Sequence, residues 1–139
     1  MKCLFSAPKL TKKSFEIIWQ DRSSREVYNQ WRALSDLGKL YSIWQDTGVL
    51  VHLADIVHPD IVDSLNIKDS DDFLPGQTIS VKRKKDRFIC IKCKSGWTSF
   101  RQFYYGPKKV MSPTDFFNGY ISKHRLRKQF FVTADSAES

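Results

Sequence analysis

The stretch QTISVKRKKDRFICIKCKSGWTSFRQFYY, residues 77–105, decides the fold of this chain. Runs rich in β-branched and aromatic residues occupy Gln77–Lys82, Arg87–Cys93 and Trp97–Tyr104. Two polar turns, Lys84–Asp86 and Lys94–Gly96, separate these runs. Short turns between strand-like runs are typical of antiparallel hairpins. The stretch therefore predicts three consecutive strands.

The residues before this stretch predict two more strands. They cover Lys39–Gln45 and Val49–Val57, and Asp46-Thr47-Gly48 forms a hairpin turn between them. The longest loop, Pro59 to Pro75, then leads to the central stretch and indicates a surface excursion or an insertion.

Two helices are predicted outside the strands. Ser23 and Glu26 have the spacing of a capping box, and Gly38 marks the end of that first helix. Ser112 followed by Pro113 starts a second helix. This order of elements predicts a mainly β fold, an oligonucleotide-binding (OB)-fold-like Greek-key β-barrel of about five strands, with one N-terminal-side helix and one C-terminal helix. An open sheet flanked by helices is the alternative.

The aromatic residues are expected to serve mostly as core. We expect Trp31 and Trp44 to be buried, because four Trp and 41% apolar residues suffice for a packed core. Strand alternation places Trp97 and Phe103 on one face and Phe100 on the other. They cannot all be stacking platforms for bases, because at least one face must be core.

The length of 139 residues indicates one domain. We divide it into a linker at residues 1–14, an OB-like domain at 15–122, and a basic, then flexible, tail at 123–139. No run approaches the ~20 apolar residues of a membrane span, and Met1–Phe5 is too short for a signal peptide. We therefore expect no membrane association and no secretion.

Cys3, Cys90 and Cys93 are an odd number of cysteines, which is typical of a reducing compartment. Cys90 and Cys93 form a C-x-x-C pair, but they lie in a predicted strand whose alternation sends them to opposite faces. Zinc would need two further ligands, and no second C-x-x-C or H-x3-H exists. We predict buried or half-buried strand cysteines and no metal.

Charge is strongly segregated along the chain. Residues 82–128 carry 14 Lys/Arg against Asp86 and Asp115, a net +12 that exceeds the +8 of the whole chain, while Asp55–Asp72 carries a net −5. Such segregation makes one face of a folded domain attractive to polyanions. We predict a nucleic-acid surface that uses Lys82, Arg83, Lys84, Lys85, Arg87, Lys92, Lys94 and Arg101. A solvated hairpin tip is the alternative for Lys82–Arg87.

Several short stretches resemble, in order, the C-terminal domain of the methionyl-tRNA formyltransferase family. They are Ala7-Pro8-Lys9-Leu10-Thr11-Lys12, Ile17-Ile18-Trp19, Arg32-Ala33-Leu34, Leu74-Pro75-Gly76, and Gly106 to Met111 followed by Ser112, Asp115, Phe116, Phe117, Asn118 and Gly119. The resemblance covers about Ala7 to Tyr120. The chain departs from the family at Ser35–Gly38, in place of Asn-Pro-x-Pro, at Ile18, in place of Asp, and at Tyr104-Tyr105, in place of Gln-Pro.

The resemblance implies a domain that follows a Rossmann-type formyltransferase domain and holds the initiator Met-tRNA for it. That N-terminal domain of the same protein would bind 10-formyltetrahydrofolate, so no cofactor is expected here. Nothing in the chain matches the family's catalytic Asn-His-Asp set, and we expect no catalysis by this chain alone. The resemblance adds Lys9, Lys12 and Lys13 of the linker and Lys108 and Lys109 as phosphate contacts; Arg125 extends the basic surface or only solubilises the tail.

The departures and the basic segment Lys123–Lys128 favour an organellar over a bacterial member. We therefore expect a monomer in the mitochondrial matrix, with the bacterial cytoplasm as the alternative. A second function remains open: the C-terminal domain of a related formyl-folate hydrolase or dehydrogenase, packing against its neighbour without nucleic acid. A complete enzyme ranks last, because no acid, base and nucleophile set converges.

Overall fold

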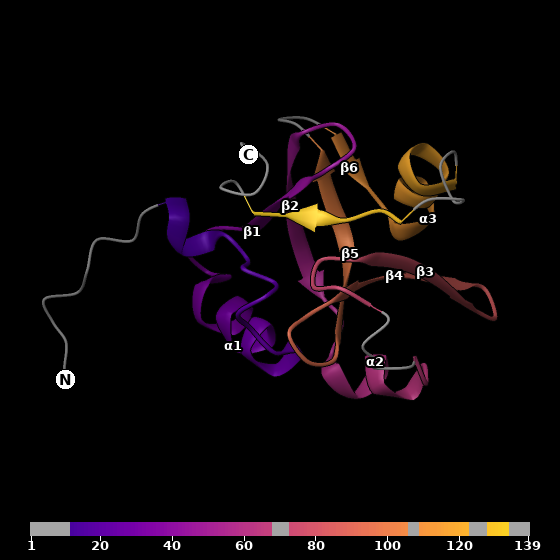
Figure 1. The fold of residues 1–139 in the computed structure, drawn as a ribbon, viewed down its shortest axis with the longest axis horizontal. Helices are drawn as coiled ribbons and strands as arrows, with labels where there is room; N and C mark the ends of the chain where they lie inside the picture. The colour runs from indigo at the N-terminus through magenta and orange to yellow at the C-terminus, as the bar shows by residue number, and fades with distance from the viewer. Residues whose placement is uncertain (1–11, 68–72, 106–108, 123–127, 134–139) are drawn as a thin grey trace, which may run out of the picture.

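An antiparallel sheet with helices around it dominates the computed structural model, which describes residues 12–67, 73–105, 109–122 and 128–133. Within these residues the sheet has 7 strands (Figure 1). The strands are β1 (Leu40–Trp44), β2 (Val49–Ile56), β3 (Thr78–Arg83), β4 (Asp86–Lys92), β5 (Trp97–Tyr105), β6 (Lys109–Met111) and β7 (Phe131–Val132). The predicted mainly β fold with flanking helices is confirmed, and all five predicted strands are present.

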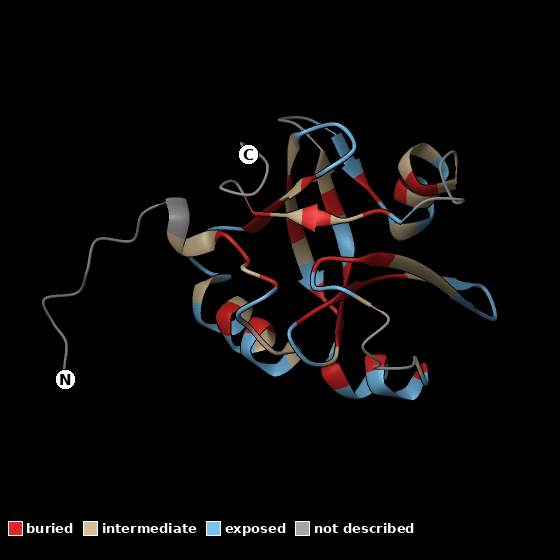
Figure 2. Cartoon of the chain, viewed as in Figure 1, coloured by how far each residue is buried: buried red, intermediate tan, exposed pale blue. Residues whose placement is uncertain are grey.

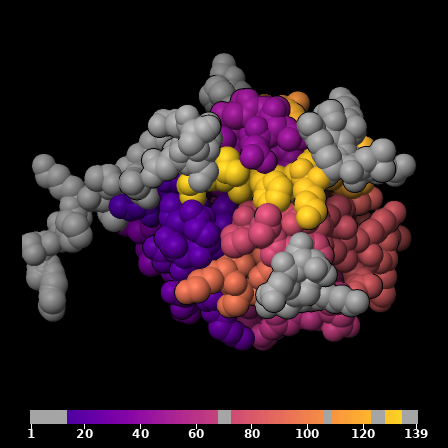
Figure 3. Space-filling view, in the orientation of Figure 1, coloured from indigo at the N-terminus to yellow at the C-terminus, as the bar shows by residue number. Residues whose placement is uncertain are grey.

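The strands follow the order β3-β4-β5-β2-β1-β7, and β6 pairs with β5. The sheet does not close into a complete barrel. Its edges approach each other at an isolated bridge between Gln77 and Phe130, and the amide of Thr78 donates to the carbonyl of Gln129 over 2.8 Å. Figure 3 shows the yellow C-terminal strand between the purple β1–β2 region and the pink residues before β3.

Both predicted helix starts are confirmed. Helix α1 (Ser24–Leu34) begins after a capping box between Ser23 and Glu26. Helix α3 (Pro113–Phe116) begins after a second capping box, between Ser112 and Asp115, and continues into a π-helical turn, η2 (Phe117–Ile121). A short 3-10 helix, η1 (Lys12–Phe15), precedes α1.

The loop predicted from Pro59 to Pro75 contains helix α2 (Pro59–Ser64). His58 caps this helix, because its side chain accepts a hydrogen bond of 3.1 Å from the amide of Asp60. Val62 and Leu65 are buried against a cluster that includes Cys90 and Trp97. Tertiary packing therefore holds a helix that is too short to show a periodic pattern in the sequence.

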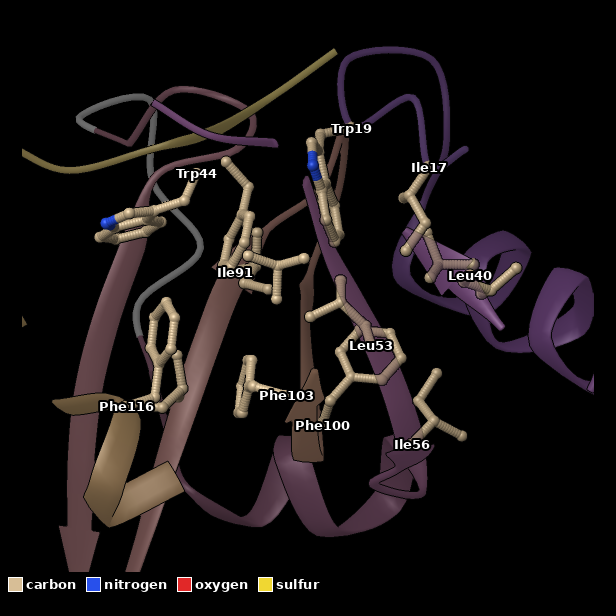
Figure 4. Close-up of a cluster of buried hydrophobic side chains, with 14 of the residues drawn as sticks. Ile17, Trp19, Leu40, Trp44, Leu53, Ile56, Ile91, Phe100, Phe103 and Phe116 are labelled. Carbon is tan, nitrogen blue, oxygen red and sulfur yellow. The ribbon is translucent and has the colours of Figure 1, made fainter. Parts of the chain in front are cut away.

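The main core lies between the sheet, α1 and α3 (Figure 4). Its largest fully buried side chains include Trp19, Trp44, Phe100, Phe103, Phe116 and Phe131. Trp97 is buried in the second cluster, and Trp31 packs partly buried against the main core. The structural roles predicted for these aromatic residues are thus confirmed.

The C-terminal residues differ from the tail that we expected at 123–139. Phe131 is buried, and Ile43 and Trp44 of β1 pair with Val132 and Phe131 of β7. The basic residues before β7 hid this pairing, because a strand of two residues has no alternation to detect.

Cys90 and Cys93 are both buried and free. They belong to different hydrophobic clusters, as their opposite faces predicted. Burial raises the pKa of the Cys90 thiol to about 12. Among the described residues no group of three or more His, Cys, Asp or Glu could hold a metal ion.

Candidate nucleic-acid interface

The turn between β3 and β4 carries the densest positive charge among the predicted site residues. We call Lys82–Arg87 the basic turn. Lys82 pairs with Arg87 and Arg83 with Asp86, so Lys84 and Lys85 form the tip of the hairpin. Lys84 has a φ of 54°, the left-handed conformation that tight hairpin turns require. The tip is exposed and projects from the body of the domain (Figure 2).

A groove of ≈ 360 Å³ runs from the basic turn to β5 and the start of α3. We call it the basic groove. Its lining consists of Lys85, Asp86, Arg87, Phe88, Phe100, Arg101, Ser112, Pro113 and Thr114. The fold thus brings Arg101, which is exposed, next to the basic turn. Three cations and two hydroxyl groups against one carboxylate form a surface suited to phosphate oxygens.

Arg87 is held in place inside this groove. Its guanidinium carbon lies 3.8 Å from the centroid of the Phe117 ring. Its Nη1 donates a hydrogen bond of 2.5 Å to the hydroxyl of Ser80. Both contacts orient the guanidinium, so Arg87 serves structure and charge together.

Arg83 points toward the other side of the hairpin. Its Nη2 donates a hydrogen bond of 2.5 Å to the carbonyl oxygen of Leu65, just after α2. Helix α2 packs through Val62 on the face of β4 that carries Cys90, whereas Phe116 of α3 packs with Ile89 on the opposite face. The exposed Asp60 and Asp63 of α2 therefore lie away from the basic groove.

Lys92 does not take part in the predicted surface. Its side chain is only 5% exposed, and its ammonium group donates a hydrogen bond of 3.0 Å to the carbonyl oxygen of Cys93. The residue lies at the end of β4, where Gly76 and Gln77 cross and bond its backbone. The segment that contains Gly76 and Gln77 therefore covers the Lys92 side chain. Strand alternation alone predicts that this side chain lies on the outer surface.

Lys94 is exposed but belongs to a different part of the surface. It lies in the β4–β5 turn, and its amide donates to the carbonyl of Arg22 over 2.8 Å. Strand β4 separates it from the basic turn by about 20 Å, the length of a strand of this size. The predicted continuous track from Lys82 to Lys94 is therefore not formed.

The remaining predicted residues are only partly described. Lys109 is exposed at the start of β6, beside a second hollow of ≈ 450 Å³ lined by Val110, Met111, Asp115, Gly119 and Tyr120. Lys12 and Lys13 lie in η1, and their side chains are outside the described part of the structure. Lys9, Lys108 and Arg125 fall outside the described residues.

Six groove residues were not predicted as ligands: Asp86, Phe88, Phe100, Ser112, Pro113 and Thr114. Ser112 carried a signal, but the sequence indicated only its role as a helix cap. They come from three separate segments of the sequence, which the pairing of β4 with β5 and the placement of α3 bring together.

A family model for the C-terminal domain of formyl transferases matches residues 9–121. The chain belongs to this family. The resemblance predicted from short motifs is thereby confirmed over most of the chain.

Curated relatives agree with this assignment. The bovine mitochondrial methionyl-tRNA formyltransferase is 29% identical over 119 residues, which cover 83% of this chain and 28% of the relative. The human mitochondrial enzyme is 28% identical over 116 residues, with 83% and 28% covered. The enzyme of Caldicellulosiruptor saccharolyticus is 26% identical over 117 residues, with 84% and 34% covered. The chain thus spans about a third or less of the length of these relatives.

Within the described residues, the basic groove gathers cations and hydroxyl groups from the basic turn, β5 and the start of α3. Among the described residues, clearly shifted pKa values belong to Glu26, Tyr41, Cys90 and Tyr120, none of which lines the basic groove. Within the described residues, no helix is long and apolar enough to cross a membrane.

Proposed function

We propose that this domain is the tRNA-holding part of a methionyl-tRNA formyltransferase. In this role Lys and Arg side chains contact phosphates of the initiator Met-tRNA, and the tRNA is oriented without reading of its bases. The observation that carries the proposal is the basic groove in a domain of the formyl transferase family. Lys85 of the β3–β4 turn, Arg87 of β4 and Arg101 of β5 line it together.

A separate N-terminal domain of the same protein supplies the chemistry in this proposal. It binds 10-formyltetrahydrofolate and formylates the methionyl amino group, so the domain described here needs no cofactor and acts as a monomer. The mitochondrial relatives support a location in the mitochondrial matrix. A bacterial relative keeps the alternative of a bacterial cytoplasm.

The test is a titration of fluorescent initiator tRNA with this chain at two salt concentrations. If Lys82, Lys84, Lys85 and Arg101 each neutralise one phosphate, log affinity falls against log salt with a slope of about −3. A fourfold rise in salt then weakens binding roughly 60-fold. An elongator tRNA is expected to bind similarly, because phosphate contacts carry no sequence information.

A charge-matched pair of variants separates the groove from general attraction. Lys85→Ala/Arg101→Ala removes two cations of the groove and lowers the steepness of the salt dependence by about two units. Arg25→Ala/Arg32→Ala removes two exposed cations from α1, which lies at the far side of the domain (Figure 1). The second variant is expected to keep nearly all of the affinity.

Failure of binding at low salt, or equal losses in both variants, would contradict the proposal. The first result would favour the support domain of a formyl-folate hydrolase or dehydrogenase. Equal losses in the two variants would mean that tRNA affinity depends only on the net charge of the chain.

A further inference from the structure

A row of side chains crosses four strands on the outer face of the sheet. The register places Tyr41 of β1 opposite His52 of β2, His52 opposite Tyr104 of β5, and Tyr104 opposite Val110 of β6. Side chains directly opposite each other lie about 5 Å apart at Cβ. The row is therefore a continuous strip of two phenol rings, an imidazole and an aliphatic group.

The strip faces away from the main core. The neighbouring row in the register, Leu40, Leu53, Phe103 and Met111, belongs entirely to the core cluster. Alternation sends the strip to the opposite face. There His52 and Tyr104 are half-buried, and Val110 is 53% exposed. A solvent-facing side of an antiparallel sheet is ordinarily polar, so this face is unusually aromatic.

The charge beside the strip is positive. The ammonium group of Lys39 lies 4.8 Å from the centroid of the Tyr104 ring. Lys109 of β6 does not add to this charge, because alternation places it on the face of Met111, opposite to Val110. Other outward positions of β1, β2 and β5 hold Ile43, Leu50, Ala54 and Gln102, and the exposed Asp55 follows Ala54, three residues along β2 from His52. Glu16 bridges to Tyr41 but is only 4% exposed, which leaves the His52–Tyr104 end as the accessible part.

We propose that this strip stacks an unpaired base of the bound RNA on Tyr104. The inference rests on the proposed function, because it names a second contact with the same nucleic acid. Lys39 holds the place over the ring that a base would take. On binding, the base replaces the ammonium group above the phenol, and Lys39 moves to the adjacent phosphate. An aromatic ring beside a cation is an arrangement typical of sites for single-stranded nucleic acids.

Unpaired nucleotides are the chemistry that fits, since the bases of a duplex have no free face for stacking. A hydrophobic protein partner fits less well, because Lys39 would lose water without gaining an anion. The basic groove is a separate surface, because its lining contains no residue of β1 or β2. The two surfaces are therefore expected to bind different parts of one RNA.

The experiment compares a short single-stranded oligoribonucleotide with an RNA duplex of the same length. Tyr104→Leu keeps an apolar side chain but removes the ring, and it is expected to weaken single-strand binding roughly tenfold. Duplex affinity and its salt dependence should not change. Tyr104→Phe keeps the ring and is expected to bind both RNAs as the wild type does.

A second readout does not depend on the stability of the variants. Cross-linking of a 4-thiouridine oligonucleotide to the wild-type chain, followed by peptide mapping, should label the segments that contain His52 and Tyr104. Labels confined to the basic turn would contradict base stacking on Tyr104. Equal affinity of Tyr104→Leu and the wild type for the single strand would contradict it as well. Either result would leave the proposed role of the basic groove intact. Absence of binding to either RNA would overturn both proposals. Concentration-dependent self-association that Val110→Asp abolishes, together with no label on the strip, would assign this face to a second copy of the chain.

Discussion

Gly76 and Phe131 join the two edges of the sheet through a contact that only glycine permits. The amide of Phe131 donates a hydrogen bond of 2.9 Å to the carbonyl of Gly76, and the amide of Gly76 donates one of 2.7 Å to the carbonyl of Lys92. The φ of Gly76 is +89°, and the carbonyl oxygen of Phe131 occupies the place where a Cβ would lie. Strands β4 and β7 are thus connected through a single residue.

Gly76→Ala should therefore destabilise the domain severely. The left-handed conformation costs a side chain about 1 kcal/mol, and the Cβ must also displace the backbone of β7. We expect a loss of about 3 kcal/mol or more in the free energy of unfolding, measured by urea denaturation.

Gly48→Ala is the matched control for this prediction. Gly48 also has a positive φ, +68°, but no atom lies within 4 Å of its added Cβ. Gly48→Ala should lower the free energy of unfolding by about 1 kcal/mol. Equal losses at the two positions would show that the contact with Phe131 does not matter.

Local sequence patterns were sufficient to predict the hairpins and both helix starts. The strands β3, β4 and β5 follow from short polar turns between β-branched runs, and the capping boxes at Ser23 and Ser112 follow from side-chain chemistry within four residues. In each case the interactions that decide the structure lie close together in the sequence. The basic turn was predictable for the same reason.

Long-range packing decided the features that the sequence did not reveal. Lys92 is buried because Gly76 and Gln77 cross the end of β4, and β7 exists because β1 offers it an edge. Phe100 and Phe103 are both in the core although alternation separates them. Asp55 of β2 has a φ of 56° and lies opposite the part of β5 between Phe100 and Phe103 where the alternation of the two faces is interrupted. No pattern within one strand indicates such an irregularity.

Lys85 and Arg87 line the same groove but should respond differently to replacement. Arg87 packs on Phe117 and bonds Ser80, so Arg87→Ala is expected to lower the free energy of unfolding by about 1 kcal/mol and also weaken tRNA binding. Lys85 is exposed at the tip. Lys85→Ala should weaken binding alone. Thermal denaturation and tRNA titration of both variants would distinguish them, and equal stability of the two would contradict the anchoring of Arg87.

Lys92→Met tests whether the buried lysine contributes to RNA binding. Its ammonium group bonds the carbonyl of Cys93 inside the domain and does not reach the surface. We expect tRNA affinity to change less than about twofold, whereas a contact with a phosphate would contribute about one unit to the salt slope. Salt-dependent titration checks this directly. Lys85→Ala, with the same change in charge, is the control.

Cys90 and Cys93 should resist thiol reagents in the folded protein. With a pKa of about 12, Cys90 is ionised in roughly one molecule in ten thousand at pH 8. Both side chains are also inaccessible, at 0% exposure. Alkylation at pH 8 followed by peptide mapping should leave both unmodified, and denaturant should make both react within minutes. Rapid labelling of either cysteine under native conditions would mean that β4 opens locally.

Ser23 and Glu26 form the capping box that starts α1, and acid should weaken it. The amide of Ser23 donates to the carboxylate of Glu26 over 2.9 Å, and its hydroxyl accepts from the amide of Glu26 over 3.2 Å. Hydrogen bonding to Ser23, first through its backbone, lowers the pKa of Glu26 below 4.5. A lowered pKa in the folded state means that the ionised carboxylate stabilises the fold above about pH 4.5. This contribution disappears as the pH falls through the lower folded value.

Ser23→Ala is accordingly expected to cost about 1 kcal/mol at neutral pH. The difference from the wild type should shrink below pH 4.5, where the Glu26 carboxylate no longer distinguishes the two proteins. NMR titration should also move the pKa of Glu26 upward in the variant, although not fully, because the bond from the backbone of residue 23 remains possible. Ser35→Ala is the control at the other end of α1, where the cap uses backbone groups alone, and it should change stability by less than about 0.5 kcal/mol. A cost of Ser23→Ala that stays constant from pH 7 to pH 3 would show that the Ser23 hydroxyl does not contribute to the lowered pKa of Glu26.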